Sequence, residues 1–196
     1  MCLPSVHRRK FLGLVGLLLG GRSFAQSDPA SCAATKLHTD KVNLIRLRPY
    51  HPTYVIAYFG EGGSKAGYTR VGMNRVIQAI QKNPDVEVEF VECYDDICQH
   101  CERLKPSSTG SVWGRRHTCR SAEDPVVVKE VTEANRQVLN LLGLQFGAII
   151  SLKELVPLMR DGLPDIGKSG IKQIGGSAIQ ARYEKGLKAI SAHLNI

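Results

Sequence analysis

The stretch Val86-Glu87-Val88-Glu89-Phe90-Val91-Glu92-Cys93 alternates apolar and acidic residues as far as Phe90, after which Val91 is also apolar. Strict alternation predicts a β-strand with one face in the core and the other in water. The strand runs directly into residues 93–121, which hold most of the cysteines and are broken by Pro106, Gly110 and Gly114. Proline and glycine at this density indicate loops. A Cys-rich loop is therefore expected to leave the core at the end of this strand.

The segments on both sides have the patterns of further strands and helices. The predicted strands cover residues 42–48 and 146–150, and residues 54–59 fit either a buried strand or a helical turn. The predicted helices run from Thr69 to Asn83, over residues 126–142, from a capping box at Ser151 to about Arg160, and over residues 177–194. Residues 162–176 read as a connector rich in glycine and proline. Because strands and helices do not alternate regularly, we expect a single small α+β domain over residues 41–196, with a short sheet, several helices and the Cys-rich loop 93–121.

The N-terminus predicts export. Arg8-Arg9-Lys10-Phe11-Leu12 matches the core of a twin-arginine signal, and the apolar stretch that follows is too short to span a bilayer. Ser23-Phe24-Ala25 offers a cleavage site, so residues 1–25 are predicted to be the signal and residues 26–40 a flexible leader. A general secretory signal or an uncleaved anchor is the alternative. The mature protein is expected to be periplasmic or otherwise exported, and not an integral membrane protein.

The charge of the chain does not indicate nucleic-acid binding. The formal net charge is +8, but residues 1–25 contain four basic residues and no acidic one. The mature chain has 22 basic against 18 acidic residues, without the concentrated basic face that nucleic acid requires. The sequence also offers no nucleophile–base pair, no phosphate-binding glycine loop and no paired carboxylates, so whether the protein is an enzyme stays open.

Four of the six cysteines are grouped as Cys93-x4-Cys98-x2-Cys101-x17-Cys119, whereas Cys2 lies in the signal and Cys32 in the leader. Two thiolates two residues apart can bind one metal, and flanking cysteines can complete its coordination. The four are therefore the candidate ligands of an iron–sulfur cluster. Zinc is the alternative, with His100 and His117 as additional candidate ligands. Asp96 is expected to cap the turn after it.

Two other interpretations stay open for these cysteines. An oxidising compartment favours structural disulfides in a binding module. A strand followed by Cys98-Gln99-His100-Cys101 is also typical of thiol–disulfide oxidoreductases, although Pro106 interrupts the long helix that such enzymes have. Basic residues around the cluster would suit an acidic redox partner protein; they are Arg103, Lys105, Arg115, Arg116 and Arg120.

Residues 43–160 resemble the DUF1284 family of small bacterial and archaeal proteins. Three stretches carry the resemblance: Ile45-Arg46-Leu47-Arg48-Pro49-Tyr50-His51, Gly67-Tyr68-Thr69-Arg70 through Asn74-Arg75-Val76, and Asp95-Asp96-Ile97-Cys98-Gln99-His100-Cys101. The resemblance implies an iron–sulfur centre, and it adds His51 as a candidate ligand or pocket residue. The chain departs from the family pattern at Tyr54, where the family opening has a cysteine. Residues and resemblance together predict an exported iron–sulfur protein with an electron-transfer or redox-sensing role.

Overall fold

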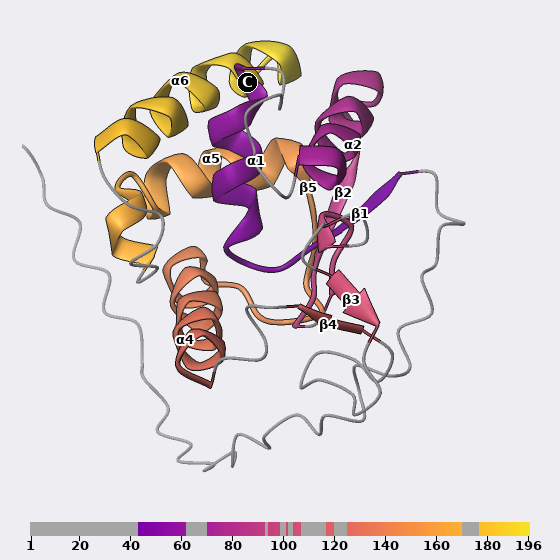
Figure 1. The fold of residues 1–196 in the computed structure, drawn as a ribbon. Helices are drawn as coiled ribbons and strands as arrows, with labels where there is room; N and C mark the ends of the chain where they lie inside the picture. Colours follow the sequence, from indigo (N-terminus) through magenta and orange to yellow (C-terminus); the bar gives the residue numbers. More distant parts are fainter. Residues whose placement is uncertain are drawn as a thin grey trace, which may run out of the picture.

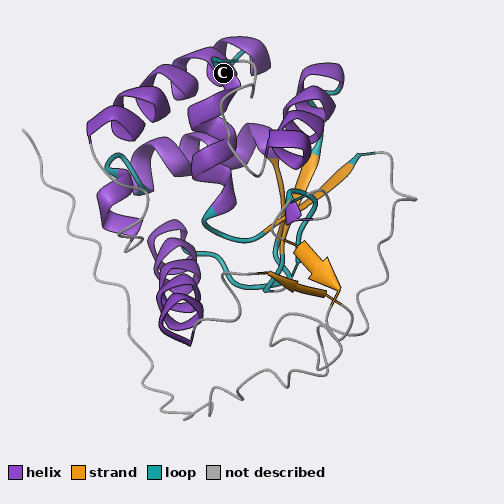
Figure 2. Cartoon of the chain, viewed as in Figure 1, coloured by secondary structure: helices purple, strands orange, loops and turns teal. Residues whose placement is uncertain are grey.

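The computed structural model describes residues 43–61, 70–92, 94–98, 101, 104–106, 117–119, 125–169 and 177–196. The predicted signal and leader lie outside these residues, as do Cys93 and His100. Within them the chain is an α+β domain, as the sequence predicts (Figures 1 and 2). No helix in the described part of the chain is long and apolar enough to cross a membrane.

The main sheet has three strands in the order β1–β2–β5. The strand β1 (Leu44–Leu47) pairs in parallel with β2 (Glu87–Phe90), and β5 (Ile149–Ser151) pairs antiparallel with β2 on its other side. Val88 and Phe90 of β2 are buried and Glu87 is exposed, as the alternation predicts. Parallel pairing of β1 and β2 puts their C-terminal ends at the same edge of the sheet.

Five α-helices and one 3₁₀ helix surround this sheet in the described residues. They are α1 (His51–Phe59), α2 (Arg70–Lys82), α4 (Pro125–Leu142), α5 (Leu152–Gly162), η4 (Ile166–Ser169) and α6 (Ser177–Leu194). Figure 1 shows α1, α5 and α6 on one side of the strands. The predicted capping box is confirmed, since the Ser151 hydroxyl accepts a hydrogen bond from the Glu154 backbone N–H at 3.2 Å. The core between helices and sheet is apolar and continuous.

The structure decides one open expectation and corrects two others. Residues 54–59 belong to a helix, the second of the two alternatives, because α1 begins at His51 with Pro52 in its first turn, where proline is tolerated. The strand expected at residues 146–150 lies at Ile149–Ser151, where it pairs with β2. The Cys-rich loop contains a small hairpin of β3 (Leu104–Pro106) and β4 (His117–Cys119), which the sequence did not indicate.

The helices α1 and α6 cross closely at Gly186. A Cβ atom at this position would clash with the backbone carbonyl oxygen of Ile56. The absence of a side chain therefore lets the two backbones approach, with Ile56 and Ile190 buried nearby in the same core. This contact fixes α1, and through it the position of the residue that begins α1, His51.

We predict that Gly186→Ala destabilises the protein by about 1–3 kcal/mol, because the added methyl group overpacks a backbone contact. Gly60→Ala is the matched control, since a Cβ there would meet the Ala189 Cβ atom at an ordinary 3.6 Å. Urea unfolding measures both variants. Equal stability of the two variants would contradict the close approach of α1 and α6.

Candidate metal centre

The segment after β2 is anchored to β1 by two consecutive aspartates. The Asp96 carboxylate accepts a hydrogen bond from the Arg46 N–H at 2.8 Å, and the Asp96 N–H donates to the Arg46 carbonyl at 3.1 Å. The Asp95 carboxylate accepts from the Arg48 N–H, also at 2.8 Å. These bonds hold the start of the Cys-rich loop against the end of β1.

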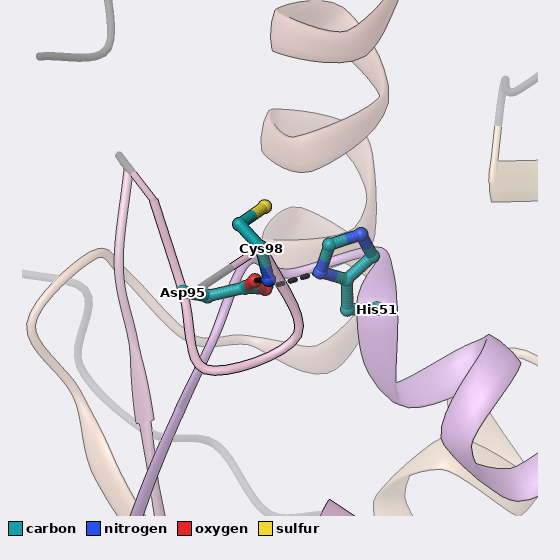
Figure 3. Close-up of side chains that lie close together, drawn as sticks. All are labelled: His51, Asp95 and Cys98. Atoms are coloured by element: carbon teal, nitrogen blue, oxygen red, sulfur yellow. Dashed lines mark hydrogen bonds and ion pairs between the residues drawn. The ribbon is translucent and has the colours of Figure 1, made fainter. Parts of the chain in front are cut away.

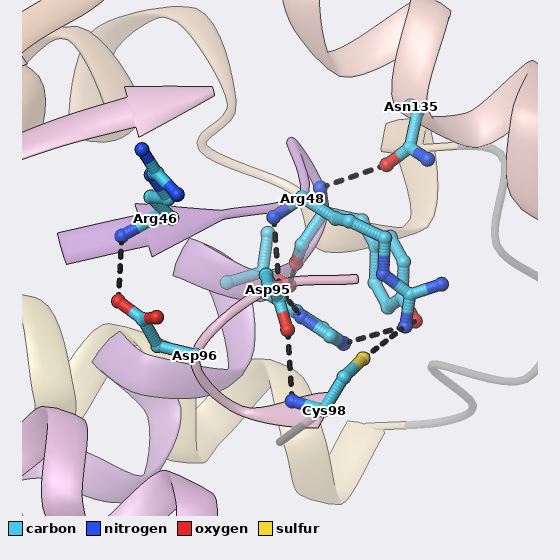
Figure 4. Close-up of polar contacts among 9 residues, drawn as sticks. Arg46, Arg48, Asp95, Asp96, Cys98 and Asn135 are labelled. Atoms are coloured by element: carbon cyan, nitrogen blue, oxygen red, sulfur yellow. Dashed lines mark hydrogen bonds and ion pairs between the residues drawn. The ribbon is translucent and has the colours of Figure 1, made fainter. Parts of the chain in front are cut away.

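Asp95 also sets the turn that carries Cys98. Its Oδ1 atom accepts a hydrogen bond from the Cys98 N–H at 3.0 Å. The cap that the sequence assigns to Asp96 is therefore provided by Asp95, because Asp96 is turned toward Arg46 (Figure 4). A side chain that accepts from the N–H three residues on stabilises a tight turn.

His51 reaches the same carboxylate from the first turn of α1. Its Nδ1 atom makes a short hydrogen bond to Asp95 Oδ2, and both side chains are buried. Figure 3 shows the imidazole of His51 and the Cys98 side chain next to this carboxylate. The three residues thus come from α1 and from the loop after β2.

His51, Asp95 and Cys98 form a group that could hold a metal ion. Each offers one ligand atom, and the three atoms lie within 4.8 Å of one another in a buried position. Imidazole nitrogen, carboxylate oxygen and thiolate sulfur are the ligands that zinc takes, and thiolate also suits iron–sulfur clusters.

A buried arginine occupies the space next to this group. Nη2 of Arg48 lies 3.3 Å from Cys98 Sγ and 3.3 Å from His51 Nε2. The same nitrogen donates to the Tyr50 hydroxyl at 2.8 Å, and the guanidinium carbon lies 5.0 Å from the centre of the Tyr50 ring. The Tyr50 N–H donates in turn to Asn135 of α4 at 3.3 Å, which ties this corner to a further helix (Figure 4).

The helix α2 supports the loop from the other side. A Cβ atom on Gly72 would clash with the backbone of Ile97, so a glycine at this position allows α2 to lie directly against the loop. Ile97 is fully buried there. The turn that carries Cys98 is therefore held between α2 and β1 by packing as well as by hydrogen bonds.

Burial and charge set the protonation states in the group. Burial lowers the pKa of His51, and the neighbouring Arg48 lowers it further, so His51 is neutral although Asp95 opposes the shift. Burial alone would raise the pKa of Asp95, but His51 and Arg48 more than offset it and hold this pKa far below its usual range. Burial raises the pKa of the Cys98 thiol well above its usual range, so this sulfur carries its proton at neutral pH.

The candidate ligands predicted from the sequence are only partly described. Cys98 is a buried free thiol, and Cys101 is half-buried with its N–H donating to the Cys98 carbonyl at 3.1 Å. In the β3–β4 hairpin, Cys119 is paired with Leu104 and His117 with Pro106. The side chains of His117 and Cys119 lie outside the described residues, as do Cys93 and His100.

The sequence does not identify Arg48, Tyr50 and Asp95 as site residues, although they organise this corner. The position of Asp95 could have indicated its role, because an aspartate often accepts a hydrogen bond from a backbone N–H shortly after it and so caps a turn. Arg48 and Tyr50 gave no such signal, since their partners lie on other segments of the chain.

Fold and site define a small α+β protein with a buried histidine–aspartate–cysteine group beside a C-x2-C turn. A family model described as "Protein of unknown function (DUF1284)" matches residues 65–169, and the chain belongs to this family. The matched region includes the Asp95–Cys101 stretch but not β1 or His51. No curated protein and no solved structure matches the chain.

We predict that Asp95→Asn destabilises the protein by roughly 3–5 kcal/mol, because it removes a buried charge that balances Arg48 and is hydrogen-bonded to His51. The control is Asp85→Asn, which removes an exposed ion pair with Lys153 and is expected to have little effect. Urea unfolding of the two variants checks this. Similar losses in both would show that Asp95 does not organise the site.

We also predict that acid destabilises the metal-free protein through His51. The pKa of His51 is lowered from 6.5 in the folded state, so below about pH 6.5 the unfolded chain binds a proton that the folded chain does not. The free energy of unfolding should fall with decreasing pH, by up to about 1.4 kcal/mol per pH unit for this group. Asp95 adds a further loss below about pH 4, where its carboxylate would be protonated in the unfolded chain.

Urea unfolding between about pH 8 and pH 5 measures this dependence. In His51→Asn the free energy of unfolding should fall less between about pH 6.5 and 5, and the difference from the unmodified protein should be the contribution of one proton. An unchanged pH dependence in this variant would contradict a buried neutral His51.

Proposed function

We propose that this protein binds a metal through Cys98 and Cys101, in an iron–sulfur centre with an electron-transfer or redox-sensing role. The observation that carries the proposal is the convergence of His51, Asp95 and Cys98 in one buried group next to the C-x2-C turn. A bound cation would offset the negative charge whose burial keeps this thiol protonated, so metal binding would release the Cys98 proton.

Two further cysteines are proposed to complete the coordination. Cys119 belongs to β4, whose partner strand β3 begins three residues after Cys101, and Cys119 itself is paired with Leu104. Cys93 comes two residues before Asp95, which anchors the loop. Their positions along the backbone are therefore compatible with a four-thiolate centre.

Zinc is the second candidate. The mixed nitrogen, oxygen and sulfur donors of His51, Asp95 and Cys98 favour it, since zinc accepts all three ligand types. An iron–sulfur cluster instead requires mainly thiolates, which the cysteine spacing favours.

A thiol–disulfide oxidoreductase has less support as a function of Cys98 and Cys101. The attacking thiol of such an enzyme is accessible and has a lowered pKa. Cys98 is 5 % exposed, and burial raises its pKa. A disulfide-stabilised binding module remains a prediction of the sequence.

Export belongs to the same proposal. The Arg8-Arg9 pair supports a twin-arginine route, which carries proteins already folded. A thiolate-bound centre benefits from this route, because the metal is inserted before the cysteines meet an oxidising compartment. We propose a periplasmic or otherwise exported location for the mature protein on this ground.

We predict that the full chain, purified anaerobically, contains iron and acid-labile sulfide and absorbs visible light. Cys98→Ser and Cys101→Ser should each reduce the bound metal by more than about tenfold. Loss of an outer group of a metal site already lowers metal affinity by about that factor, and loss of a ligand should cost more. Cys32→Ser is the control and should keep the full metal content. Elemental analysis and the visible spectrum give the measurement.

Other results would redirect or overturn the proposal. Stoichiometric zinc without colour would favour the zinc alternative. No metal together with no free thiols would favour disulfides, and equal metal in all three variants would show that Cys98 and Cys101 are not ligands.

A further inference from the structure

Both ring nitrogens of His51 are engaged inside the protein. Nδ1 is hydrogen-bonded to Asp95 Oδ2, and Nε2 lies 3.3 Å from Nη2 of Arg48. Asp95 is acceptor-only as a carboxylate, and Arg48 is donor-only, so the ring must donate through Nδ1 and accept through Nε2. A neutral imidazole with its proton on Nδ1 satisfies both neighbours.

Arg48 is held in one place by this arrangement. Its backbone N–H is bound by Asp95, and its Nη2 atom lies between His51 Nε2, the Tyr50 hydroxyl and Cys98 Sγ. The residue is 5 % exposed, which makes the loss of any acceptor costly. An arginine fixed in this way presents an N–H donor to the Cys98 sulfur at 3.3 Å.

We propose that Arg48 is a positioning residue of the metal centre, donating a hydrogen bond to the Cys98 sulfur. We also propose that Asp95, besides its direct contact with the Cys98 N–H, acts on this sulfur through His51 and Arg48. The series Asp95–His51–Arg48–Cys98, called the relay below, rests on the proposed function in one respect, that Cys98 is a ligand. It gives His51 a different role from the ligand role that the family resemblance implies.

The relay is favoured over direct ligation by His51 because of the cost of releasing Arg48. To bind a metal, Nε2 of His51 would have to give up the contact with Nη2, and the metal would take the position of the buried, positively charged guanidinium. In the relay every contact of the metal-free protein is kept. The carboxylate, imidazole and guanidinium then act as the outer groups that tune many metal sites.

An N–H donor on a ligand sulfur withdraws electron density from it. Reduction potentials of iron–sulfur centres depend on such hydrogen bonds, and the donor stabilises the more negative, reduced state. The same effect moves sulfur-to-metal charge-transfer absorption to higher energy. Loss of the Arg48 donor should therefore lower the reduction potential and shift this absorption to longer wavelength.

A double-mutant cycle on the full chain tests the relay. The metal-free protein is titrated anaerobically with Co²⁺, whose thiolate charge-transfer band reports on the sulfur. The variants are Arg48→Met, His51→Asn and the double variant. The amide of Asn can still donate to Asp95 in place of Nδ1, but it offers no acceptor where Nε2 was.

The relay predicts a shift of the band to longer wavelength in Arg48→Met. A smaller shift is expected in His51→Asn, where the two N–H groups of Nη2 are left with the Tyr50 hydroxyl and the Cys98 sulfur as acceptors. The double variant should shift no further than Arg48→Met alone, because His51 acts only through Arg48. Where the native protein holds iron, its midpoint potential should fall in the same non-additive pattern. Arg46→Met is the matched control, since the Arg46 side chain pairs with Glu89 at 2.9 Å, and it should leave the band in place.

The other outcomes separate the relay from the proposed function. A wild-type protein without a thiolate band would overturn both. A wild-type band that His51→Asn abolishes would make His51 a ligand and overturn the relay alone, as would additive shifts or an unshifted Arg48→Met. If Arg48→Met fails to fold, Arg48→Lys takes its place in the cycle. Lysine keeps the charge but lacks the planar guanidinium that contacts three acceptors in the native protein. The same non-additivity is expected for this variant.

Discussion

One carboxylate organises the corner on which the candidate site depends. Asp95 accepts hydrogen bonds from the Arg48 N–H, from His51 Nδ1 and from the Cys98 N–H. These donors belong to the end of β1, the start of α1 and the loop after β2. A buried carboxylate without such donors would cost several kcal/mol, so the three segments have to meet where Asp95 can be satisfied.

The charges around Asp95 explain how this corner could hold a metal. Asp95 and Arg48 are buried with opposite charge, and the neutral His51 lies between them. The pair is balanced, so an additional thiolate at Cys98 would leave a buried negative charge, and burial keeps this thiol protonated. A bound cation would supply the missing positive charge, which ties deprotonation of Cys98 to metal binding.

The sequence predicted the helices and strands that have a local pattern. It did not predict the contacts between segments that are far apart in the chain. Alternation located β2, and periodicity with a capping box located α2, α4, α5 and α6. The helix α1 stayed ambiguous because its residues are apolar on most sides. The pairing of β3 with β4 and the joining of Arg48 to Asp95 and Cys98 depend on segments far apart in the chain, and no periodicity reports such distances. Cys98 was a candidate because the C-x2-C spacing is itself local.

The hydrogen bonds of Asp95 also bear on how the site could bind a metal. They fix the Cys98 backbone and the His51 ring through contacts within the protein, and the packing of Gly72 against Ile97 holds the same turn. A loop that a metal had to order on binding would lose part of its affinity to conformational entropy. Here that ordering at Cys98 is supplied by the fold. The geometry of the turn is therefore set by Asp95, and a metal would have only to replace the proton on the sulfur.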